Sequence, residues 1–265
     1  MKKKILLILS AVLLVAALTA GAVLLINSFK KETPSKGENE KTELSDNVLT
    51  LLVGESKQLK LNNATEPTKF TSSDPSVAKV DDAGKVSALA KGQTEIICTS
   101  GDKSYTCYVF VNEKSVGKEQ FPTYDDTEFP NAALSINSGS EGDYVTTTFY
   151  VSDFEVLSAF SAELIYDEAC LEFVRCVPVG GGIDYVEATP KENGVLYVGA
   201  IGYTTNAIQD GKLLKFIFKI KDDAVGNLAT VSFVDSDFNM FVYVEDGKEK
   251  TAEATLRGCE IEILP

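Results

Sequence analysis

The side chains of this chain that could perform chemistry are its cysteines and carboxylates, because its 265 residues include no histidine. Without histidine, Ser-His-Asp and Cys-His nucleophilic sites are excluded, and so is any zinc site with histidine ligands. The five cysteines include no Cys-x-x-Cys pair of the type found in metal and redox sites. Disulfide formation and carboxylate chemistry are the reactions left to consider.

Two of the cysteines have a spacing that suggests a disulfide. Cys98 and Cys107 lie symmetrically about Asp102-Lys103. A two-residue turn there would place the two cysteines opposite each other on adjacent strands, within reach of a disulfide bond. The alternative is a pair of reduced, half-buried thiols. Because the total of five is odd, a fully bridged framework is not expected.

One acidic segment imitates the start of a calcium loop. Asp235, Asp237 and Asn239 alternate in the way that oxygen ligands surround a hard cation. The imitation fails at Met240, where glycine should allow the sharp turn, and at Asp246, where the loop needs glutamate. No pair of carboxylates is marked for glycoside hydrolysis either. We therefore expect no catalytic residue, no metal site and no cofactor, so the chain is not expected to be an enzyme.

Composition limits the partners. The formal net charge is −14, and without Lys2, Lys3, Lys4, Lys30 and Lys31 the remainder carries 20 − 39 = −19. Nucleic acid and anionic lipid are poor partners for such a surface. With 44% hydrophobic residues, the chain can bury two modest cores.

The elements that position these side chains are predicted to be strands. Apolar residues alternate along 149–166 and 214–220, which buries one face of a strand and exposes the other. Turn-forming pairs such as Gly142-Asp143 and Asp210-Gly211 separate the alternating segments. This spacing is typical of antiparallel β-sandwiches.

The N-terminus predicts a membrane segment. Lys2-Lys3-Lys4 precedes an uncharged, mostly apolar run from Ile5 to Ile26. At about 1.5 Å per residue this run spans a bilayer core, and residues 1–28 are interpreted as an uncleaved signal anchor or transmembrane helix. A cleaved signal peptide is the competing interpretation, because Ala20-Gly-Ala22 offers small residues. The lysines favour a cytoplasmic N-terminus, so we expect a single-pass cell-membrane protein whose C-terminal domains are extracellular.

Two segments are predicted to be linkers. Residues 29–46 are rich in Lys, Glu, Ser and Thr, and they bury too little surface to offset the entropy of ordering. Residues 113–131 contain Pro122 and the acidic run Asp125-Asp-Thr-Glu128, which is either a solvated linker or a cation or partner site.

Between the linkers, residues 47–112 resemble a group 2 bacterial Ig-like (Big2) domain. The resemblance lies in the segments 49–59, 70–80, 84–89 and 91–96. Phe70 replaces the tryptophan that this family usually has. The resemblance implies an Ig-like β-sandwich, with a role as a spacer or, alternatively, in direct adhesion to sugar or protein.

The last domain, residues 132–265, resembles a cohesin, the dockerin-capturing module of bacterial polysaccharide-degrading complexes. The matching segments are 133–151, 160–173 and 194–234, with Tyr166-Asp167 followed by Leu171-Glu-Phe173 as a core signature. The resemblance implies an all-β chain in which a jelly-roll sandwich, like those of cohesins and certain carbohydrate-binding modules, follows the Ig-like sandwich. It also implies a non-catalytic docking protein that binds a dockerin-bearing protein.

The same resemblance implies a partner-binding sheet face. Its predicted members, from the strand before Tyr166-Asp167 and from a later strand, are Ala159, Ser161, Glu163, Tyr197, Gly199 and Ile201. Ala159 and Ser161 stand where type I cohesins usually carry Asn and Asp, which puts the usual hydrogen bonds in doubt. Any calcium is expected on the dockerin partner. The alternative functions are direct binding of carbohydrate, for which no tryptophan is available, and a structural adhesin.

Overall fold

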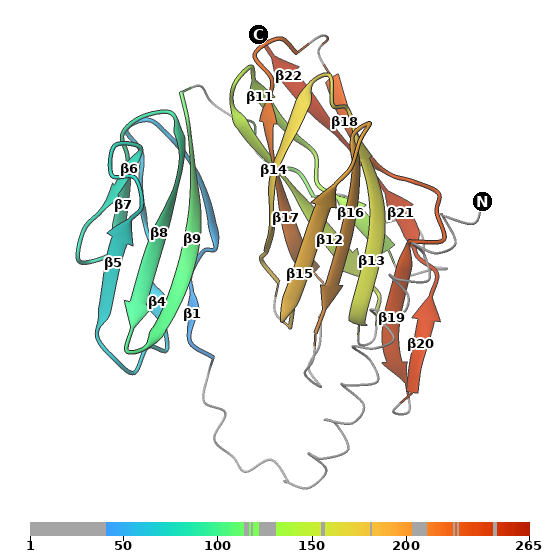
Figure 1. The fold of residues 1–265 in the computed structure, drawn as a ribbon, viewed down its shortest axis with the longest axis horizontal. Coiled ribbons are helices and arrows are strands. Elements are labelled where there is room, and N and C mark those ends of the chain that lie inside the picture. Colours follow the sequence, from blue (N-terminus) through green and yellow to red (C-terminus); the bar gives the residue numbers. More distant parts are fainter. Residues whose placement is uncertain are drawn as a thin grey trace, which may run out of the picture. The chain divides into compact units, whose positions relative to one another are not determined.

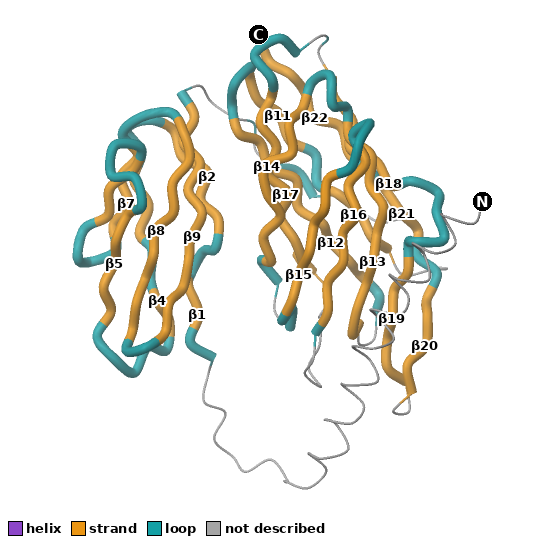
Figure 2. The backbone as a smooth tube through the Cα atoms, in the orientation of Figure 1, coloured by secondary structure: helices purple, strands orange, loops and turns teal. Residues whose placement is uncertain are grey.

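A computed structural model describes residues 41–113, 117, 119–121, 131–154, 157–180, 182–202, 211–224, 226, 228–245 and 248–265. The described residues form strands, turns and loops, with no helix among them (Figures 1 and 2). Within this part of the chain, no helix has the length and apolarity to cross a membrane. The anchor predicted at residues 1–28 lies outside the described residues.

The N-terminal sandwich is built from short strands that share one apolar core. They are β1 (Glu43–Leu44), β2 (Val48–Leu52), β3 (Ser56–Gln58), β4 (Leu61–Asn62), β5 (Thr68–Ser72), β6 (Ala78–Val80), β7 (Lys85–Ala88), β8 (Gly92–Ser100) and β9 (Lys103–Asn112). Its described strands form a four-stranded sheet in the order β2-β9-β8-β5, a three-stranded sheet in the order β3-β7-β6, and the pair β1-β4.

Alternation along β8 and β9 explains the core of this sandwich. Ile96, Cys98 and Cys107 are fully buried, while their neighbours in sequence are more exposed, and Val109 is fully buried as well. Phe70 packs against this core from β5. The observed sandwich agrees with the predicted Ig-like architecture.

The C-terminal sandwich contains the remaining strands. They are β10 (Asn131–Leu134), β11 (Asn137–Ser140), β12 (Tyr144–Ser152), β13 (Leu157–Tyr166), β14 (Leu171–Pro178), β15 (Tyr185–Pro190), β16 (Val195–Ile201), β17 (Gly211–Ile220), β18 (Leu228–Phe233), β19 (Met240–Glu245), β20 (Lys248–Ala252), β21 (Thr255–Arg257) and β22 (Cys259–Leu264). One sheet of the described strands runs β14-β17-β12-β10-β21, and the other runs β11-β22-β18-β13-β16-β15, with β19 and β20 attached through β13.

Aromatic rings join the two sheets of this sandwich. Phe149 on β12 lies 5.0 Å, between ring centroids, from Phe160 on β13 of the facing sheet. Phe241 on β19 stacks on Phe160 at 6.2 Å, and all three rings are buried. Buried aromatic side chains contribute a large share of core stability because of their apolar area. The side of β13 that carries Phe160 therefore packs on the core, and the opposite side of β13 faces outward.

Strand β13 has a divided edge. Along one edge it pairs with β16, whereas the other edge is shared by β18 near its end and β19 near its start. Leu164 faces Phe233, and Ser161 faces Met240. The six residues 234–239 are therefore inserted opposite the two residues that separate Ser161 from Leu164. We call residues 234–239 the crossing segment.

Both predicted linkers contain residues that belong to the folded structure. The tether predicted at 29–46 extends into β1, where Leu44 pairs with Leu61 and is buried. In the linker predicted at 113–131, the amide and carbonyl groups of Gln120 pair with those of Ile136. Polar composition was a poor guide here, because an edge strand satisfies its backbone groups by pairing even when its side chains are polar.

Candidate partner-binding face

The structure brings the six predicted face residues together on neighbouring strands. In the antiparallel register of β13 and β16, the opposed pairs are Ala159 with Ile201, Ser161 with Gly199 and Glu163 with Tyr197. Residues opposite each other across an antiparallel pair lie on the same face of the sheet. The six residues are therefore contiguous, as Figure 1 lets the reader follow along β13 and β16.

A third strand, β15, extends this face. Its residues Tyr185, Glu187 and Thr189 pair with Ile201, Gly199 and Tyr197, respectively. Tyr185 is 52% exposed, and on β13 Ile165 is 43% exposed. The three strands together present an outer surface that is partly apolar. We call this surface, β13, β16 and β15 on their outward side, the docking face.

Gly199 lies in the middle of the docking face and leaves it open. A Cβ atom built at Gly199 would have as its nearest neighbour the carbonyl oxygen of Phe160, at 3.9 Å, which is an ordinary contact. The backbone of Gly199 is not in the left-handed region. A larger side chain is therefore accommodated at this position, and it would project from the face.

The crossing segment binds the two polar residues of the predicted face. Ser236 Oγ donates a hydrogen bond to Glu163 Oε2 at 2.7 Å, and the backbone N–H of Glu163 donates to Asn239 Oδ1 at 2.8 Å. Ser161 Oγ donates to the carbonyl oxygen of Phe238 at 2.5 Å. Ser161 and Glu163 thus make intramolecular hydrogen bonds in the chain as it stands.

These hydrogen bonds hold an aromatic side chain over the face. The ring of Phe238 lies 5.0 Å from the ring of Tyr197 on β16, at an interplanar angle of 36°. Lys191 Nζ lies 5.7 Å from the centre of the same Tyr197 ring. Tyr197, predicted as a contact residue, is therefore at the centre of a small aromatic cluster to which Phe238 belongs.

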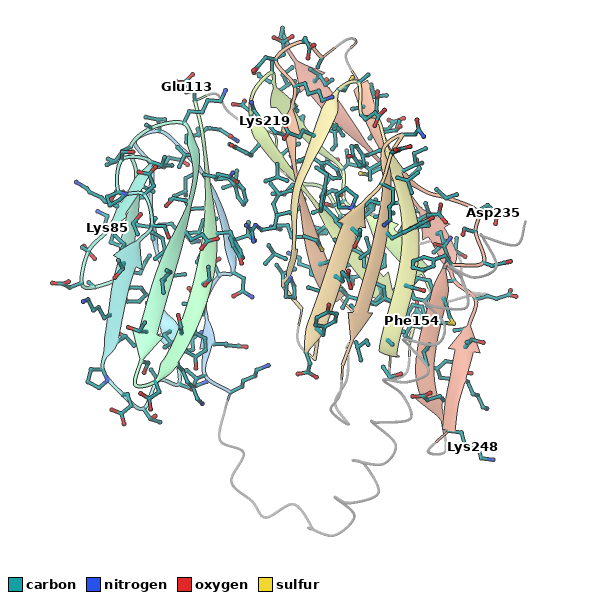
Figure 3. All side chains as sticks on the ribbon, in the orientation of Figure 1. Lys85, Glu113, Phe154, Lys219, Asp235 and Lys248 are labelled. Carbon is teal, nitrogen blue, oxygen red and sulfur yellow. The ribbon has the colours of Figure 1, made fainter. Side chains whose placement is uncertain are left out.

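Exposed carboxylates lie on the elements that carry the aromatic cluster or pair with them. Asp235 and Asp237 of the crossing segment are exposed, and so is Glu187 on β15. Figure 3 labels Asp235 at the start of the crossing segment, at the periphery of the sandwich. Carboxylates on an exposed rim attract cationic groups over distances of about 8–10 Å at physiological salt. The face therefore has an aromatic centre and an acidic edge.

The calcium-loop resemblance of the crossing segment has a structural explanation. Asn239 and Ser236 use their side chains to bind Glu163, and Asn239 Nδ2 also donates to the carbonyl of Val234. Across the residues that the structure describes, no group of three or more acidic or cysteine side chains is placed to hold a metal ion. Ser236 and Asn239 therefore serve to fold the segment onto β13.

The cysteines occupy buried positions without the predicted disulfide. Cys98 and Cys107 are both free thiols. The hairpin turns at Gly101-Asp102 and not at Asp102-Lys103, because Gly101 supplies the positive φ of +55° that the turn requires. Cys98 therefore faces Tyr105, and Cys107 faces Ile96. The prediction that the two cysteines are directly opposed was wrong, because the turn lies one residue earlier in the chain than predicted.

Burial makes these thiols poor nucleophiles. Burial raises the pKa of Cys107 to about 12, with a smaller contribution from the charge of Asp46. Burial also raises the pKa of Cys259 to about 11 and that of Cys98 above its ordinary value. A thiol must ionise to attack or to bind a metal, so raised values keep these groups inert near neutral pH.

Sequence reasoning missed part of the docking face. The contribution of β15 had a usable signal, since Tyr185, Glu187 and Thr189 alternate with Val186 and Ala188 at a period of two. Phe238 had none, because its contact with Tyr197 depends on how the crossing segment leaves the sheet edge.

The N-terminal sandwich matches a known family. The model of the family "Bacterial Ig-like domain (group 2)" matches residues 40–109. The predicted Ig-like resemblance is confirmed over this segment. Among proteins of curated function, none matches the chain.

The remainder of the chain is similar to solved cohesin structures. One is the sixth cohesin of scaffoldin B from Acetivibrio cellulolyticus in complex with a mutant Cel5 dockerin, with 21% identity, a TM-score of 0.42, and coverage of 49% of this chain and 97% of that chain. Another is the OlpA cohesin in complex with Doc918 from Clostridium thermocellum, with 12% identity, a TM-score of 0.46, and coverage of 52% and 100%. A third is a non-cellulosomal cohesin from the archaeon Archaeoglobus fulgidus, with 14% identity, a TM-score of 0.37, and coverage of 52% and 92%.

Proposed function

We propose that this chain is a non-catalytic docking protein whose C-terminal sandwich binds a dockerin-bearing protein through the docking face. The bound protein would be a polysaccharide-degrading enzyme or another member of such a complex. The observation that carries the proposal is the register of β13 and β16, in which Ser161 faces Gly199 and Glu163 faces Tyr197. Residues that the cohesin resemblance assigns to one partner surface are contiguous in the folded chain.

The chemistry of the face supports binding over catalysis. Its polar side chains Ser161 and Glu163 are hydrogen-bonded to the crossing segment, and the chain has no histidine to act as a general base. Gly199 keeps the middle of the face flat and accessible. Flat sheet faces with aromatic groups suit recognition of a folded protein surface, where buried aromatic anchors supply much of the binding energy.

The proposal includes a location at the cell surface. The apolar run from Ile5 to Ile26, preceded by three lysines, is the basis for a membrane anchor, and the residues that follow would tether the folded domains outside the cell. The Ig-like sandwich would then serve as a spacer. Both statements rest on the sequence pattern.

The experiment that tests the docking function is capture of a partner by the immobilised full-length chain. Secreted proteins of the source organism are passed over the chain in the presence of calcium or of a chelator, and the retained proteins are identified by mass spectrometry. We expect retention of proteins that contain dockerin sequences. We also expect retention to be lost with chelator, because the calcium would belong to the partner and not to this chain.

The same experiment separates the alternatives. Retention of the chain on insoluble polysaccharide, with no dockerin-bearing protein captured, would replace the docking proposal with direct carbohydrate binding. Absence of both kinds of retention would leave a structural adhesin and would contradict the docking proposal.

A further inference from the structure

The crossing segment has an architecture that the cohesin resemblance does not account for. It connects β18 to β19 as a six-residue insertion opposite two residues of β13, and it folds over the outward side of β13 toward β16. A six-residue insertion between two strands is long enough to form a loop that extends into solvent. Here it is fixed to the docking face instead.

One backbone hydrogen bond and several side-chain hydrogen bonds fix the segment along its length. Near its start, the backbone N–H of Val234 donates to the carbonyl of Glu163 at 2.8 Å. Near its end, Asn239 Oδ1 accepts from the N–H of Glu163, and Ser161 Oγ donates to Phe238. The bond from Ser236 to the Glu163 carboxylate fixes the middle. Each of these bonds involves either Ser161 or Glu163.

These hydrogen bonds fix the position of the Phe238 ring. Phe238 is only partly buried, and it lies against Tyr197, which is itself partly exposed on the docking face. An aromatic side chain held at an exposed surface by several hydrogen bonds has little conformational entropy left to lose on binding. Pre-ordered aromatic residues of this kind are common among the residues that dominate binding energy.

Charge defines the chemistry of the surface that fits there. Asp235 and Asp237 precede Phe238 in the crossing segment and are exposed, and Glu187 is exposed on β15. The whole chain has a formal net charge of −14. A complementary partner surface has an apolar centre to cover the Tyr197 and Phe238 rings, and lysine or arginine at its edge.

We propose that the crossing segment is part of the docking face, that Phe238 is a specificity-determining contact residue, and that Ser161 and Glu163 are positioning residues that hold it. The occupant is the dockerin-bearing protein of the proposed function, on a surface that combines an apolar centre with a cationic edge. This inference rests on the proposed function. It reassigns Ser161 and Glu163 from partner contacts to supports of a contact.

The first test compares variants of the full-length chain in binding to the captured partner. Phe238→Ala is expected to weaken binding about 30-fold, the effect of losing an interface hot spot. Leu228→Ala is the matched control, because Leu228 is 47% exposed on β18 of the same sheet but outside the docking face. Equal affinity of Phe238→Ala and the unmodified chain would overturn the inference and leave the docking function intact. If the unmodified chain captured no dockerin-bearing protein, the proposed function itself would fail.

The second test distinguishes a positioning role from direct contact. Glu163→Gln keeps an oxygen that accepts from Ser236, whereas Glu163→Ala removes it. A positioning role predicts that Gln retains affinity and that Ala loses it. Ser236→Ala should lose at least as much, because Ser236 Oγ also accepts from the N–H of Phe238 at 3.2 Å, and the losses of Ser236→Ala and Glu163→Ala should be less than additive. A loss in Glu163→Gln as large as that in Glu163→Ala would show instead that the carboxylate charge contacts the partner.

The third test reads the position of the ring without a partner. The chain has no tryptophan, so Phe238→Trp introduces a single fluorophore at this site. Acrylamide quenching of that tryptophan is expected to increase severalfold when Ser161→Ala or Glu163→Ala is added, because the ring is released to solvent. Leu228→Ala added in the same way serves as the control. Unchanged quenching with the anchors removed would overturn the positioning role.

Discussion

Gly194 lies against the carbonyl oxygen of Tyr166 so closely that a Cβ atom at Gly194 would be 2.2 Å from that oxygen. The contact is reinforced by the N–H of Tyr166, which donates to the carbonyl of Gly194 at 2.9 Å. Gly194 also has a positive φ of +69°. The Tyr-Asp signature and the Gly-Val-Leu-Tyr strand, recognised separately in the sequence, are therefore coupled at one point, where β13 ends and β16 begins.

The first prediction concerns this contact. Gly194→Ala is expected to lower the free energy of unfolding by more than the roughly 1–3 kcal/mol of backbone strain alone, because the methyl group meets the Tyr166 carbonyl. Gly54→Ala is the control: its φ of +90° is nearer to that of Gly194, but a Cβ there meets no described atom within 4 Å. Urea denaturation of both variants measures the difference. Equal losses would mean that the close approach has no energetic consequence.

A second prediction concerns Glu119, which lies in the segment expected to be a linker. Its Oε1 accepts hydrogen bonds from Ser135 Oγ and Thr148 Oγ1, both at 2.5 Å, and Lys215 Nζ is 3.8 Å from Oε2. Glu119→Ala leaves two hydroxyls without this acceptor and should cost about 3 kcal/mol. Glu119→Gln keeps the acceptor and should cost about 1 kcal/mol. Thermal unfolding of the two variants checks the order. The two losses become equal if charge alone holds the segment against the sheet, because both substitutions remove the carboxylate that faces Lys215.

A third prediction concerns the thiols of the N-terminal sandwich. Cys98 and Cys107 are diagonal neighbours on the sheet, a relation that separates Cα atoms by about 7–8 Å, beyond the usual disulfide range. We expect the purified chain to keep both as thiols, which alkylation in denaturant and peptide mass measurement would reveal. In the folded chain both should resist alkylation at pH 8. A Cys98–Cys107 cross-linked peptide found under non-reducing conditions would contradict the observed register.

A fourth prediction concerns pH. Because burial raises the pKa of Cys107 to about 12, its folded value exceeds the unfolded value of about 8.5. The stability contributed by the protonated thiol is therefore fully present below about pH 8.5, and it is lost as the pH rises toward 12, at about 1.4 kcal/mol per pH unit. Cys107→Ala removes this dependence. The unfolding free energies of the unmodified chain and of Cys107→Ala are compared at pH 7.5 and pH 10.5. The difference between the two proteins isolates the contribution of the Cys107 thiol, because both proteins share the titration of their lysines and tyrosines.

A fifth prediction tests the docking face directly. Gly199→Gln is expected to fold with unchanged thermal stability, because the added side chain points outward into open space. It should weaken capture of a dockerin-bearing partner at least about tenfold by keeping the partner off the sheet. Leu228→Gln provides an exposed change outside the face. Full capture by Gly199→Gln would mean that the partner binds elsewhere.

Much of the fold was predictable because it depends on local patterns. The alternation along β13 and β16 identifies which residues face outward, and a single antiparallel register then fixes Ser161 opposite Gly199. The sandwich architecture followed from such patterns and from turn residues. The same reasoning did not predict the register of the hairpin that contains Cys98. Two adjacent turn positions were possible there, and choosing the other one shifts every opposed pair of residues between β8 and β9.

The rest of the docking face depends on contacts between segments distant in sequence. Nothing near Phe238 indicates that it meets Tyr197, which lies 41 residues earlier. The hydrogen bonds of Ser161 and Glu163 to the crossing segment follow from the division of the β13 edge between two strands, and that division has no signature in a linear pattern. From the sequence alone, polar side chains on an exposed strand are equally compatible with contacts to a partner and with hydrogen bonds to another segment of the same chain.

The divided edge of β13 makes the crossing segment a replaceable part. Its two ends are held by ladders that continue without it, because β18 pairs with β22 as well as β13, and β19 pairs with β20. Sequence can therefore change in residues 234–239 while the buried rings behind β13 keep their places. Exchange of this one hexapeptide would alter the outward surface of the sheet and leave its frame intact, in the way that a common frame carries interchangeable loops.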